Sequence, residues 1–449
     1  MANEAHSSAL TSASVAVIGA GWSGLACAHR LAKSGFQPVI FESAPEAGGR
    51  ARRALLMDDQ QQAVWRDNGQ HLMLAGCHAI KSLCEEIGVT LPRTSFRYTD
   101  GSRQLSLKGQ RGRLGLIVGL FSARGFNWQE RRRLIQALGI LQWHGWKARP
   151  HETVQDWLVR SKQPISLIRD FWTPLALAIL NTPLDQAAMA RLAPVLRDTL
   201  GGGCETLAML QPHADLSTSL VSPLLNAIRT AGGQIHCGQR IKAIQRHVNS
   251  QAATYSITLH DDTQIDYAQV ILALPPWSLG RLELPFTLTD LAERFGVQPI
   301  ATVYLGFHPK FRLSAPLVQI AGPAIADARV WAMDRAHCGE PGVIAISLSA
   351  KGPWTGLDND TLAKRCIDQL VPLMVPQSET PRCLWHKVVT VHRATYAATP
   401  LARISAEALM PLPGIYLTGD WTHPEYPATL EAAVASGRAT ADQVLRSHR

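Results

Sequence analysis

Residues Gly19 to Gly24 (GAGWSG) form a G-x-G-x-x-G pattern, a residue spacing that can bind the phosphates of a nucleotide. Gly19 permits a tight turn, Gly21 lets the backbone approach a pyrophosphate, and Gly24 allows a helix to pack closely on a strand. Trp22 and Ser23 would lie in the first turn of that helix, whose N-terminus attracts negative charge. The pattern therefore predicts a dinucleotide site, although a glycine turn in an ordinary βαβ unit remains the alternative.

An acidic residue stands at the distance expected for the other end of such a ligand. Glu42 follows Gly21 by 21 positions, close to the spacing of about 20 typical of the carboxylate that binds an adenosine ribose. A carboxylate there favours a ribose without a 2′-phosphate, which disfavours NADP.

Two further motifs could touch the same ligand. Gly48-Gly49-Arg50 follows Glu42 closely, so the chain could pass near the ligand and Arg50 could neutralise a phosphate or the edge of a ring. An exposed arginine beside a glycine turn is the alternative. Near the end of the chain, Gly419-Asp420 follows an apolar run, and the segment PATLEAAVASGR (427–438) predicts a helix start, which repeats the geometry of the first motif.

The hydrophobic pattern supplies the elements that must position these motifs. Ser14 to Ile18 is a β-branched run, Gly24 to Lys33 has helical spacing, and Pro38 to Phe41 is a second apolar run. Together they predict a βαβ unit of the usual ~30 residues. Further strands are expected at 234–236, 255–259 and 270–274, a second sheet at 302–307, 330–333 and 343–348, and a last buried strand at 415–418.

Between Phe96 and Gln211 the pattern changes to Arg, Trp and Leu at helical spacing, including 131–146 and 154–180. We therefore expect a mostly helical insertion. Within it, Leu114 to Phe121 (LGLIVGLF) is far shorter than the ~20 residues that cross a bilayer, but basic residues flank it on both sides. A surface-lying anchor and a core helix with solvated basic ends are both compatible with this stretch.

Composition limits the class of protein. The 449 residues are 46% hydrophobic and 18% charged, which suits a globular protein of two or three domains and excludes a small disulfide scaffold or a disordered chain. The net charge of +9 favours anionic surfaces such as phospholipid head groups. Nucleic acid is the least favoured partner, because no aromatic platform accompanies the basic residues.

The cysteine pattern indicates a reducing environment. The eight cysteines contain no C-x-x-C pair and no metal-like cluster with histidine. We expect reduced, buried thiols and no metal. Residues 1 to 13 lack the basic start and apolar core of a signal peptide, so a cytoplasmic location is expected.

From about residue 14 to residue 446 the chain resembles the hydroxysqualene dehydroxylases, a squalene-associated branch of the amine oxidase and phytoene desaturase flavoproteins. Four further markers carry this resemblance: DNGQH at 67–71, WTPL and LNT at 172–175 and 180–182, LRD and GGG at 196–198 and 201–203, and GDW with YPAT at 419–421 and 426–429. The chain departs from the pattern at Ala432, where many relatives have Gly, and at Cys77, where others carry larger residues.

The resemblance implies FAD as cofactor and a fold in the α/β class. It implies a discontinuous Rossmann-like FAD-binding domain (14–95, 212–284 and 400–449) with an inserted mixed α+β substrate-binding domain (96–211 and 285–399). Besides the glycine turn and Glu42, the implied FAD contacts are Gly49, Arg50, the backbone of Ile241 at the adenine, Gly419 with Asp420 at the ribityl chain, and Thr429 with Leu430 at the pyrimidine edge.

The activity implied is the reductive dehydroxylation of hydroxysqualene, a C30 allylic alcohol, to squalene in squalene and hopanoid biosynthesis, with hydride from reduced flavin. Loss of the hydroxyl group needs a general acid. The candidates are Asp67, His71 and Tyr426, against the alternatives of a turn carboxylate, a buried histidine and a packing tyrosine. Trp172, Asn181 and Trp277 could line a substrate tunnel or belong to the core.

An apolar substrate of ~30 carbons would cost on the order of 20 kcal/mol to dissolve in water, so it should come directly from lipid. We therefore expect peripheral contact with the inner face of the cytoplasmic membrane. Only one dinucleotide fingerprint is present, so the electron donor for FAD is an external one of unknown identity. A carotenoid-type desaturase, an amine oxidase and a non-catalytic isoprenoid-binding protein remain alternatives.

Overall fold

The structure is a computed structural model, and it describes residues 14–57, 63–106, 123–203, 205–248, 253–288, 291–321 and 328–448. The expected surface anchor at Leu114 to Phe121 and Cys204 lie outside the described residues.

A five-stranded parallel sheet collects strands from the start, the middle and the end of the chain. Its spatial order is β10 (Gln234–Cys237), β2 (Gln37–Glu42), β1 (Ser14–Ile18), β14 (Gln269–Leu272) and β22 (Ile415–Leu417). All neighbouring pairs are parallel, so the carboxyl ends of β1, β14 and β22 meet at one edge of the sheet. This sheet confirms the predicted α/β, Rossmann-like class.

Strands β2, β1, β14 and β22 are largely apolar on both faces because both faces are covered, whereas the edge strand β10 is largely exposed. Val15 and Val17 of β1 face a buried cluster with three helices, whereas Ala16 and Ile18 face a cluster with a three-stranded antiparallel sheet. The helices are α1 (Trp22–Lys33), α9 (Ser222–Thr230) and α13 (Leu430–Arg446). The strands are β11 (Ile241–Val248), β12 (Ala253–Leu259) and β13 (Gln264–Tyr267).

A seven-stranded mixed sheet forms the second lobe. Its order is β21 (Trp385–Tyr396), β15 (Val297–Gly306), β19 (Val343–Ser349), β18 (Val330–Asp334), β17 (Leu317–Ile320), β7 (Arg97–Thr99) and β8 (Gln104–Ser106). Helix α12 (Asn359–Leu370) covers the face that carries Ala301 and Val303. Strand alternation therefore turns Thr302 and Tyr304 to the opposite face, toward the segment that follows β4 (Ala63–Asp67).

The expected helical insertion is confirmed for 128–198, but its first part differs from the expectation. The helices are α4 (Trp128–Trp143), α5 (Val154–Arg160), α6 (Ile165–Leu167), a π-helical turn (Ile168–Trp172), α7 (Thr173–Leu180) and α8 (Met189–Asp198). Residues 97–106 instead form β7 and β8 of the mixed sheet. The stretch with helical spacing over 154–180 is divided among several helices, because Lys162 has a φ of 53° and Pro164 has no backbone N–H to continue a helix.

Shorter elements complete the fold. They are the β3 (Arg53–Met57) and β4 hairpin, the small sheet of β5 (Met73–Leu74), β9 (Met209–Leu210) and β6 (Arg93–Thr94), the pair β16 (Arg312–Leu313) and β20 (Met374–Val375), and helices α2 (His78–Glu86), α10 (Pro276–Leu279) and α11 (Leu291–Arg294). No helix in the described ranges is both long enough and apolar enough to cross a bilayer.

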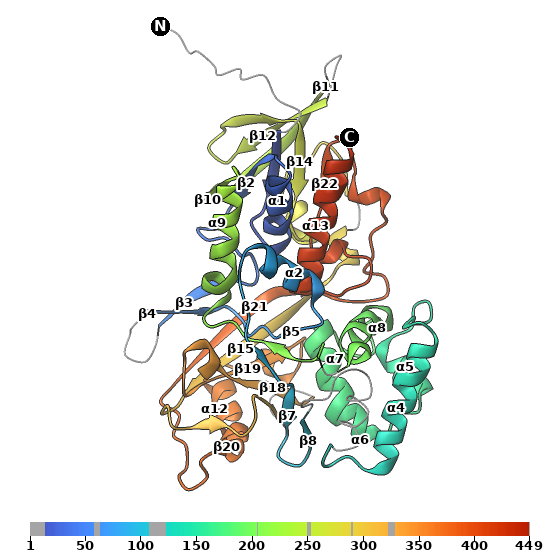
Figure 1. The fold of residues 1–449 in the computed structure, drawn as a ribbon, viewed down its shortest axis with the longest axis vertical. Helices are drawn as coiled ribbons and strands as arrows, with labels where there is room; N and C mark the ends of the chain where they lie inside the picture. The colour runs from blue at the N-terminus through green and yellow to red at the C-terminus, as the bar shows by residue number, and fades with distance from the viewer. Residues whose placement is uncertain are drawn as a thin grey trace.

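Figure 1 shows how the lobes are arranged. Helices α1, α9 and α13 lie in the upper lobe, β15, β19 and α12 lie at the lower left, and α4 to α8 lie at the lower right. The β3–β4 hairpin projects to the left at the level where the lobes meet. The strand ends of the parallel sheet therefore point toward the second lobe, and the site is expected there.

Candidate functional site

The N-terminus of α1 is open for an anion. Gly21 is its N-cap, and neither a capping side chain nor an acidic residue occupies its first turn. By contrast, Asn127, Thr153 and Thr429 cap α4, α5 and α13 with their side chains. The free N–H groups and the helix dipole at α1 therefore suit a phosphate.

Glycine is required where two loops approach one another at this helix end. Gly49 has a φ of 60°, and a Cβ on it would lie 2.9 Å from the Cα of Gly21. A Cβ on Gly24 would overlap the carbonyl oxygen of Gly19. The G-G-R loop is also bonded to the glycine-rich turn, because the N–H of Gly48 donates to the carbonyl of Ala20 at 2.8 Å. The two early motifs thus form one cradle.

Glu42 lies at the carboxyl end of β2, where it stabilises the glycine-rich turn of this cradle. Its carboxylate oxygens accept hydrogen bonds from the backbone N–H groups of Ala20 and Ala44, both at 2.8 Å. The residues before β11 reach the same place, since Gln239 donates its N–H to the carbonyl of Glu42. A surface pocket lined by Ser43 and 238–240 opens there. Ile241 begins β11 directly after it, at a position compatible with the expected adenine contact.

The early and the late motifs are in direct contact. The hydroxyl groups of Ser23 and Thr418 are 2.7 Å apart. A Cβ on Gly437 would overlap the carbonyl of Ser23, so α13 packs directly on α1. The two segments are separated by about 400 residues in sequence, yet they frame one space at the edge of the sheet.

Arg50 and Asp420 form an ion pair across this space. The Arg50 guanidinium donates to Asp420 Oδ1 at 2.7 Å and to the Ala394 carbonyl at 2.9 Å. It also lies 5.5 Å from the ring centroid of Trp277. Asn68 donates its side-chain N–H to the carbonyl of Arg50 at 3.0 Å, which ties the DNGQH segment to the same group.

Helix α13 begins at Leu430 rather than at Pro427, because the Thr429 hydroxyl caps it by accepting from the N–H of Ala432 at 3.1 Å. Glu431 in its first turn accepts from the N–H groups of Ala79 and Ile80 at the start of α2. This carboxylate fixes α13 against α2.

These features test whether the residues fit an FAD molecule. They supply an uncapped helix N-terminus, a loop approach that admits only glycine, a carboxylate at the end of β2, and a buried carboxylate at the end of β22. The residues present therefore fit a flavin dinucleotide laid across the carboxyl edge of the parallel sheet.

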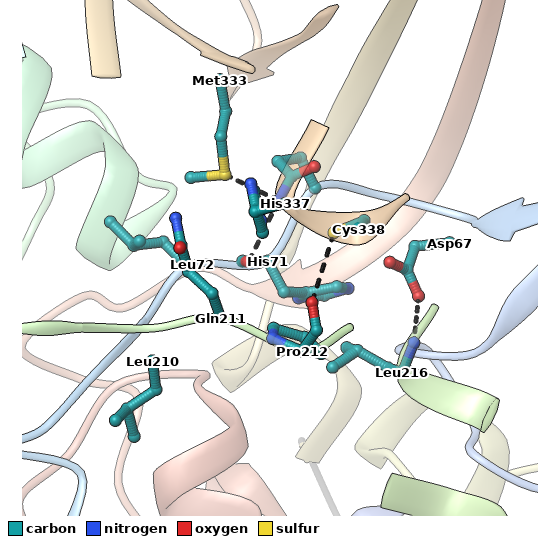
Figure 2. A pocket seen from close by; sticks show the side chains of 11 residues that line it. Asp67, His71, Leu72, Leu210, Gln211, Pro212, Leu216, Met333, His337 and Cys338 are labelled. Atoms are coloured by element: carbon teal, nitrogen blue, oxygen red, sulfur yellow. Dashed lines mark hydrogen bonds between the residues drawn. The ribbon is translucent and has the colours of Figure 1, made fainter. Parts of the chain in front are cut away.

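Asp67 ends β4 and lines a small pocket beside this cradle. Its carboxylate accepts from the N–H of Leu216 at 2.7 Å, and Arg335 lies 3.7 Å away. Burial outweighs both of these contacts and raises the pKa of Asp67 to about 6. Figure 2 shows Asp67, His71, Met333 and Cys338 around the pocket.

His71 also lines this pocket (Figure 2). Its Nε2 is buried and has no hydrogen-bond partner within the described residues. Burial, helped by the charge of Arg335, lowers the pKa of His71 to about 4. The ring is therefore neutral at neutral pH. It can relay or accept a proton, but it lacks the second ring proton that a charged imidazolium could donate.

The sequence motifs did not predict the charged groups behind this pocket. Arg335 is only 1% exposed and donates to Gln70 Oε1 at 2.7 Å and to Glu340 Oε2 at 2.5 Å. Tyr304 donates its hydroxyl proton to the carbonyl of Asp67 at 2.7 Å. These partners lie more than 230 residues from the DNGQH segment in sequence and belong to no motif, so no local signal could have identified them.

Tyr426, the third candidate acid, lies between Asp420 and α13 in sequence. Its hydroxyl donates to Asp198, which is also held by a two-point contact with Arg197. Burial and then the bond to Asp198 raise the pKa of Tyr426. Among the described residues, Asp67 and His71 line one pocket, and Tyr426 does not line it.

The three proposed tunnel residues have different surroundings. Trp172 is fully buried and donates to Gln163, and Asn181 bonds to Thr395 and to the N–H of Ala350. These contacts place both side chains in the core. Trp277 alone of the three lies against the cradle, over Arg50.

None of the seven described cysteines is in a disulfide, and they are not all buried. Cys27, Cys84 and Cys366 are buried, whereas Cys237 on β10 is exposed, which corrects the expectation for that residue. In the described ranges, no group of three or more His, Cys, Asp or Glu side chains is arranged to hold a metal ion.

Comparison with known families agrees with this site. The family model described as flavin-containing amine oxidoreductase matches residues 22–445. The chain therefore belongs to this family and is an FAD-dependent oxidoreductase.

The curated relatives indicate the branch that the chain resembles. It is 26% identical over 438 residues to the hydroxysqualene dehydroxylase of Zymomonas mobilis, covering 96% of this chain and 98% of the relative. It is 29% identical over 453 residues to that of Rhodopseudomonas palustris, covering 98% and 100%. The 15-cis-phytoene desaturase of Solanum lycopersicum is 21% identical, over 97% of this chain and 78% of the relative.

Solved structures share the fold. A putrescine oxidase with bound putrescine superimposes with a TM-score of 0.71 at 14% identity, covering 96% of this chain and 99% of that one. Cyclohexylamine oxidase from Brevibacterium oxydans gives a TM-score of 0.69 at 13% identity, covering 97% and 99%.

Proposed function

We propose that this FAD-dependent enzyme reduces hydroxysqualene to squalene. The observation that carries the proposal is a protonatable, buried carboxyl group, Asp67, on the segment that is bonded to Arg50 of the flavin cradle. The full-length similarity to hydroxysqualene dehydroxylases supports the choice of substrate.

In this reaction the C–O bond of an allylic alcohol breaks and a C–H bond forms. The leaving hydroxyl group takes a proton and departs as water, and bound reduced flavin supplies the hydride. The neighbouring double bond spreads the positive charge that develops on carbon. Electrons reach the flavin from an external donor.

Asp67 is the group of this chain that we expect to hold the proton. A carboxyl with a pKa of about 6 keeps a usable protonated fraction near neutral pH, which an ordinary aspartate does not. Its backbone is fixed by Tyr304, and one carboxylate oxygen is fixed by Leu216. We propose that neutral His71, which lines the same pocket, relays a proton between Asp67 and the substrate hydroxyl.

Tyr426 remains a second candidate for the acid. Its hydroxyl proton is engaged by the Asp198 carboxylate, and its pKa is raised, so it is a weaker acid than Asp67. The remaining proposed roles are those of the cradle: Gly19 to Gly24 at the pyrophosphate, Glu42 and Ile241 at the adenosine, Gly49 and Arg50 beside the ring, and Gly419, Asp420, Thr429 and Leu430 around the ribityl chain and pyrimidine.

We also propose that the substrate enters from lipid at the inner face of the cytoplasmic membrane. A C30 hydrocarbon chain is too insoluble to be supplied through water, and the chain carries a net charge of +9.

The decisive experiment is anaerobic mixing of the dithionite-reduced, FAD-loaded enzyme with hydroxysqualene. We expect reoxidation of the flavin absorbance with formation of one squalene for each flavin, identified by mass spectrometry. A flavin that stays reduced while the alcohol is unchanged would contradict the proposal. Reduction of oxidised enzyme by a polyene or an amine would instead support a desaturase or an amine oxidase.

A further inference from the structure

Helix α4 presents an unusual outer face to solvent. Trp128, Arg132, Gln136, Gly139 and Trp143 are all exposed, and their spacing of three to four residues puts them on one side of the helix. Trp128 is 68% exposed and Trp143 is 87% exposed. At a rise of 1.5 Å per residue, the two tryptophans stand roughly 22 Å apart along one line.

The inner side of α4 is firmly held, so this outer face has a fixed orientation. Asn127 and Glu130 form a capping box at its start, and the Glu130 carboxylate pairs with Arg103 at 2.9 Å. Leu134 and Leu141 pack in the core below. Figure 1 places α4 and α5 at the outer margin of the lower lobe, away from the parallel sheet.

Neighbouring segments add both apolar and basic groups. Ile165, at the start of α6, is 83% exposed, and Ser166 beside it bonds to Glu130 of α4. Residues 123–170 contain nine Lys and Arg and four Asp and Glu, a net charge of +5. Three of these acids, Glu130, Glu152 and Asp170, are buried, so Asp156 is the one exposed acid of this fully described stretch.

We propose that this face, which we call the α4 face and define by Trp128, Arg132, Ile140, Trp143 and Ile165, docks on an anionic phospholipid membrane. A helix with tryptophan at both ends and arginine between them suits the boundary between head groups and acyl chains. The excess of exposed positive charge matches anionic lipid. The inference rests on the proposed function, which requires a lipid-borne substrate.

The β3–β4 hairpin provides a matched control within the same chain. It also exposes a tryptophan, Trp65, at 45%, on the same side as Leu55. However, residues 53–67 contain two Arg and three Asp, a net charge of −1, and Arg53 stacks on the Trp65 ring at 4.3 Å. An exposed tryptophan without surplus positive charge should not hold the protein on anionic lipid.

The test is co-sedimentation of FAD-loaded protein with vesicles of phosphatidylglycerol and phosphatidylcholine, and with vesicles of phosphatidylcholine alone. We expect binding to the anionic vesicles only. The double variants Trp128→Ser/Trp143→Ser and Arg132→Glu/Arg133→Glu should each lower the partition coefficient at least tenfold, whereas Trp65→Ser should change it less than twofold. Flavin content and the unfolding midpoint check that each variant is folded.

Two further measurements separate this inference from the proposed function. With hydroxysqualene dispersed in detergent, both double variants should turn over as fast as the wild type, and with substrate in anionic vesicles they should be slower. No turnover by the wild type in detergent would reject the proposed activity and leave the vesicle binding result standing. Unchanged vesicle binding by both double variants would overturn the lipid-docking role of the α4 face. If light scattering also showed the wild type as a dimer and the double variants as monomers, the face would instead be a contact between two copies of the chain.

Discussion

At the scale of single residues, the site depends on burial changing the chemistry of ordinary side chains. Asp67 and His71 line one pocket, and burial moves their pKa values in opposite directions, up to about 6 for the carboxyl and down to about 4 for the imidazole. Burial disfavours the charged form of each group. The pocket is therefore lined both by a carboxyl that can be protonated and by a ring that is neutral.

The first prediction concerns pH. If protonated Asp67 is the acid, turnover needs the form that is lost as pH rises through about 6, so kcat should fall above that pH. Asp67→Asn should lower kcat at least about 100-fold and abolish this limb of the profile. Stopped-flow measurement of flavin reoxidation between pH 5 and pH 9 checks both statements.

The exposed Asp185→Asn serves as the control and should leave the profile unchanged. FAD content must be equal in all three proteins. If Asp67→Asn retained the wild-type pH dependence, the acid would have to be sought elsewhere, with Tyr426 next.

The second prediction concerns cofactor retention. Asp420 is 6% exposed and pairs with Arg50 at 2.7 Å, so Asp420→Ala removes a proposed ribityl partner and leaves Arg50 without its carboxylate. We expect the purified variant to lose most of its FAD, as measured by the ratio of flavin to protein absorbance. Asp442→Ala, at a partly exposed ion pair with Arg30, is the control. If Asp420→Ala kept the wild-type flavin content, Asp420 would not be a ribityl partner.

At the scale of elements, glycines decide how closely the two cradle helices approach. Helix α13 lies directly on α1 because Gly437 leaves no side chain between them. Ser23 of α1 is in turn bonded to Thr418, which follows β22. The position of α1 therefore fixes the position of α13, and both helix N-termini stay aimed at one space.

The third prediction tests this contact. Gly437→Ala should force α13 away from α1, reduce the stability by about 1 to 3 kcal/mol and weaken FAD binding. Gly139→Ala, on the open face of α4 where a Cβ meets nothing within 4 Å, should instead raise stability by up to about 1 kcal/mol. Urea unfolding midpoints and flavin titration measure both effects. Equal midpoints for the two variants would contradict this account of the helix contact.

At the scale of the whole molecule, Arg191 of α8 joins the helical part of the second lobe to the segment 402–426, which contains the proposed FAD contact Asp420. It is 3% exposed, and its guanidinium donates to the carbonyls of His423, Tyr426 and Ala402. The carbonyls of His423 and Tyr426 lie between Asp420 and α13, and the carbonyl of Ala402 lies before β22. A side chain of the second lobe thus holds the segment that contains Asp420.

The fourth prediction follows from that contact. Arg191→Ala leaves three carbonyls without their donor, so we expect a loss of stability of about 2 to 4 kcal/mol and faster release of FAD. Arg191→Lys should recover only part of this, since one ammonium cannot reproduce a fork of donors. The exposed Arg281→Ala should have no effect. If Arg191→Ala released FAD as slowly as the wild type, Arg191 would not be needed to hold the segment that contains Asp420.

The sequence by itself determined the cofactor cradle, since its signals are local. A glycine spacing, a carboxylate about 20 residues later and apolar runs of strand length depend only on neighbouring residues, and they predicted β1, α1, β2, β14 and β22 close to their observed bounds. The markers of the hydroxysqualene dehydroxylase branch were likewise visible without a structure.

Only the tertiary structure decided the environment of the candidate acid and the shape of the surface. The pKa of Asp67 depends on burial and on Arg335, which is 268 positions away in sequence, and no pattern in either segment records that they meet. The division of 154–180 into several helices was also not predicted from the sequence. Nor was the exposed side of α4, because helical spacing shows that one face is buried but not what covers the other. Local periodicity fixes elements, whereas desolvation and exposure are properties of the packed chain.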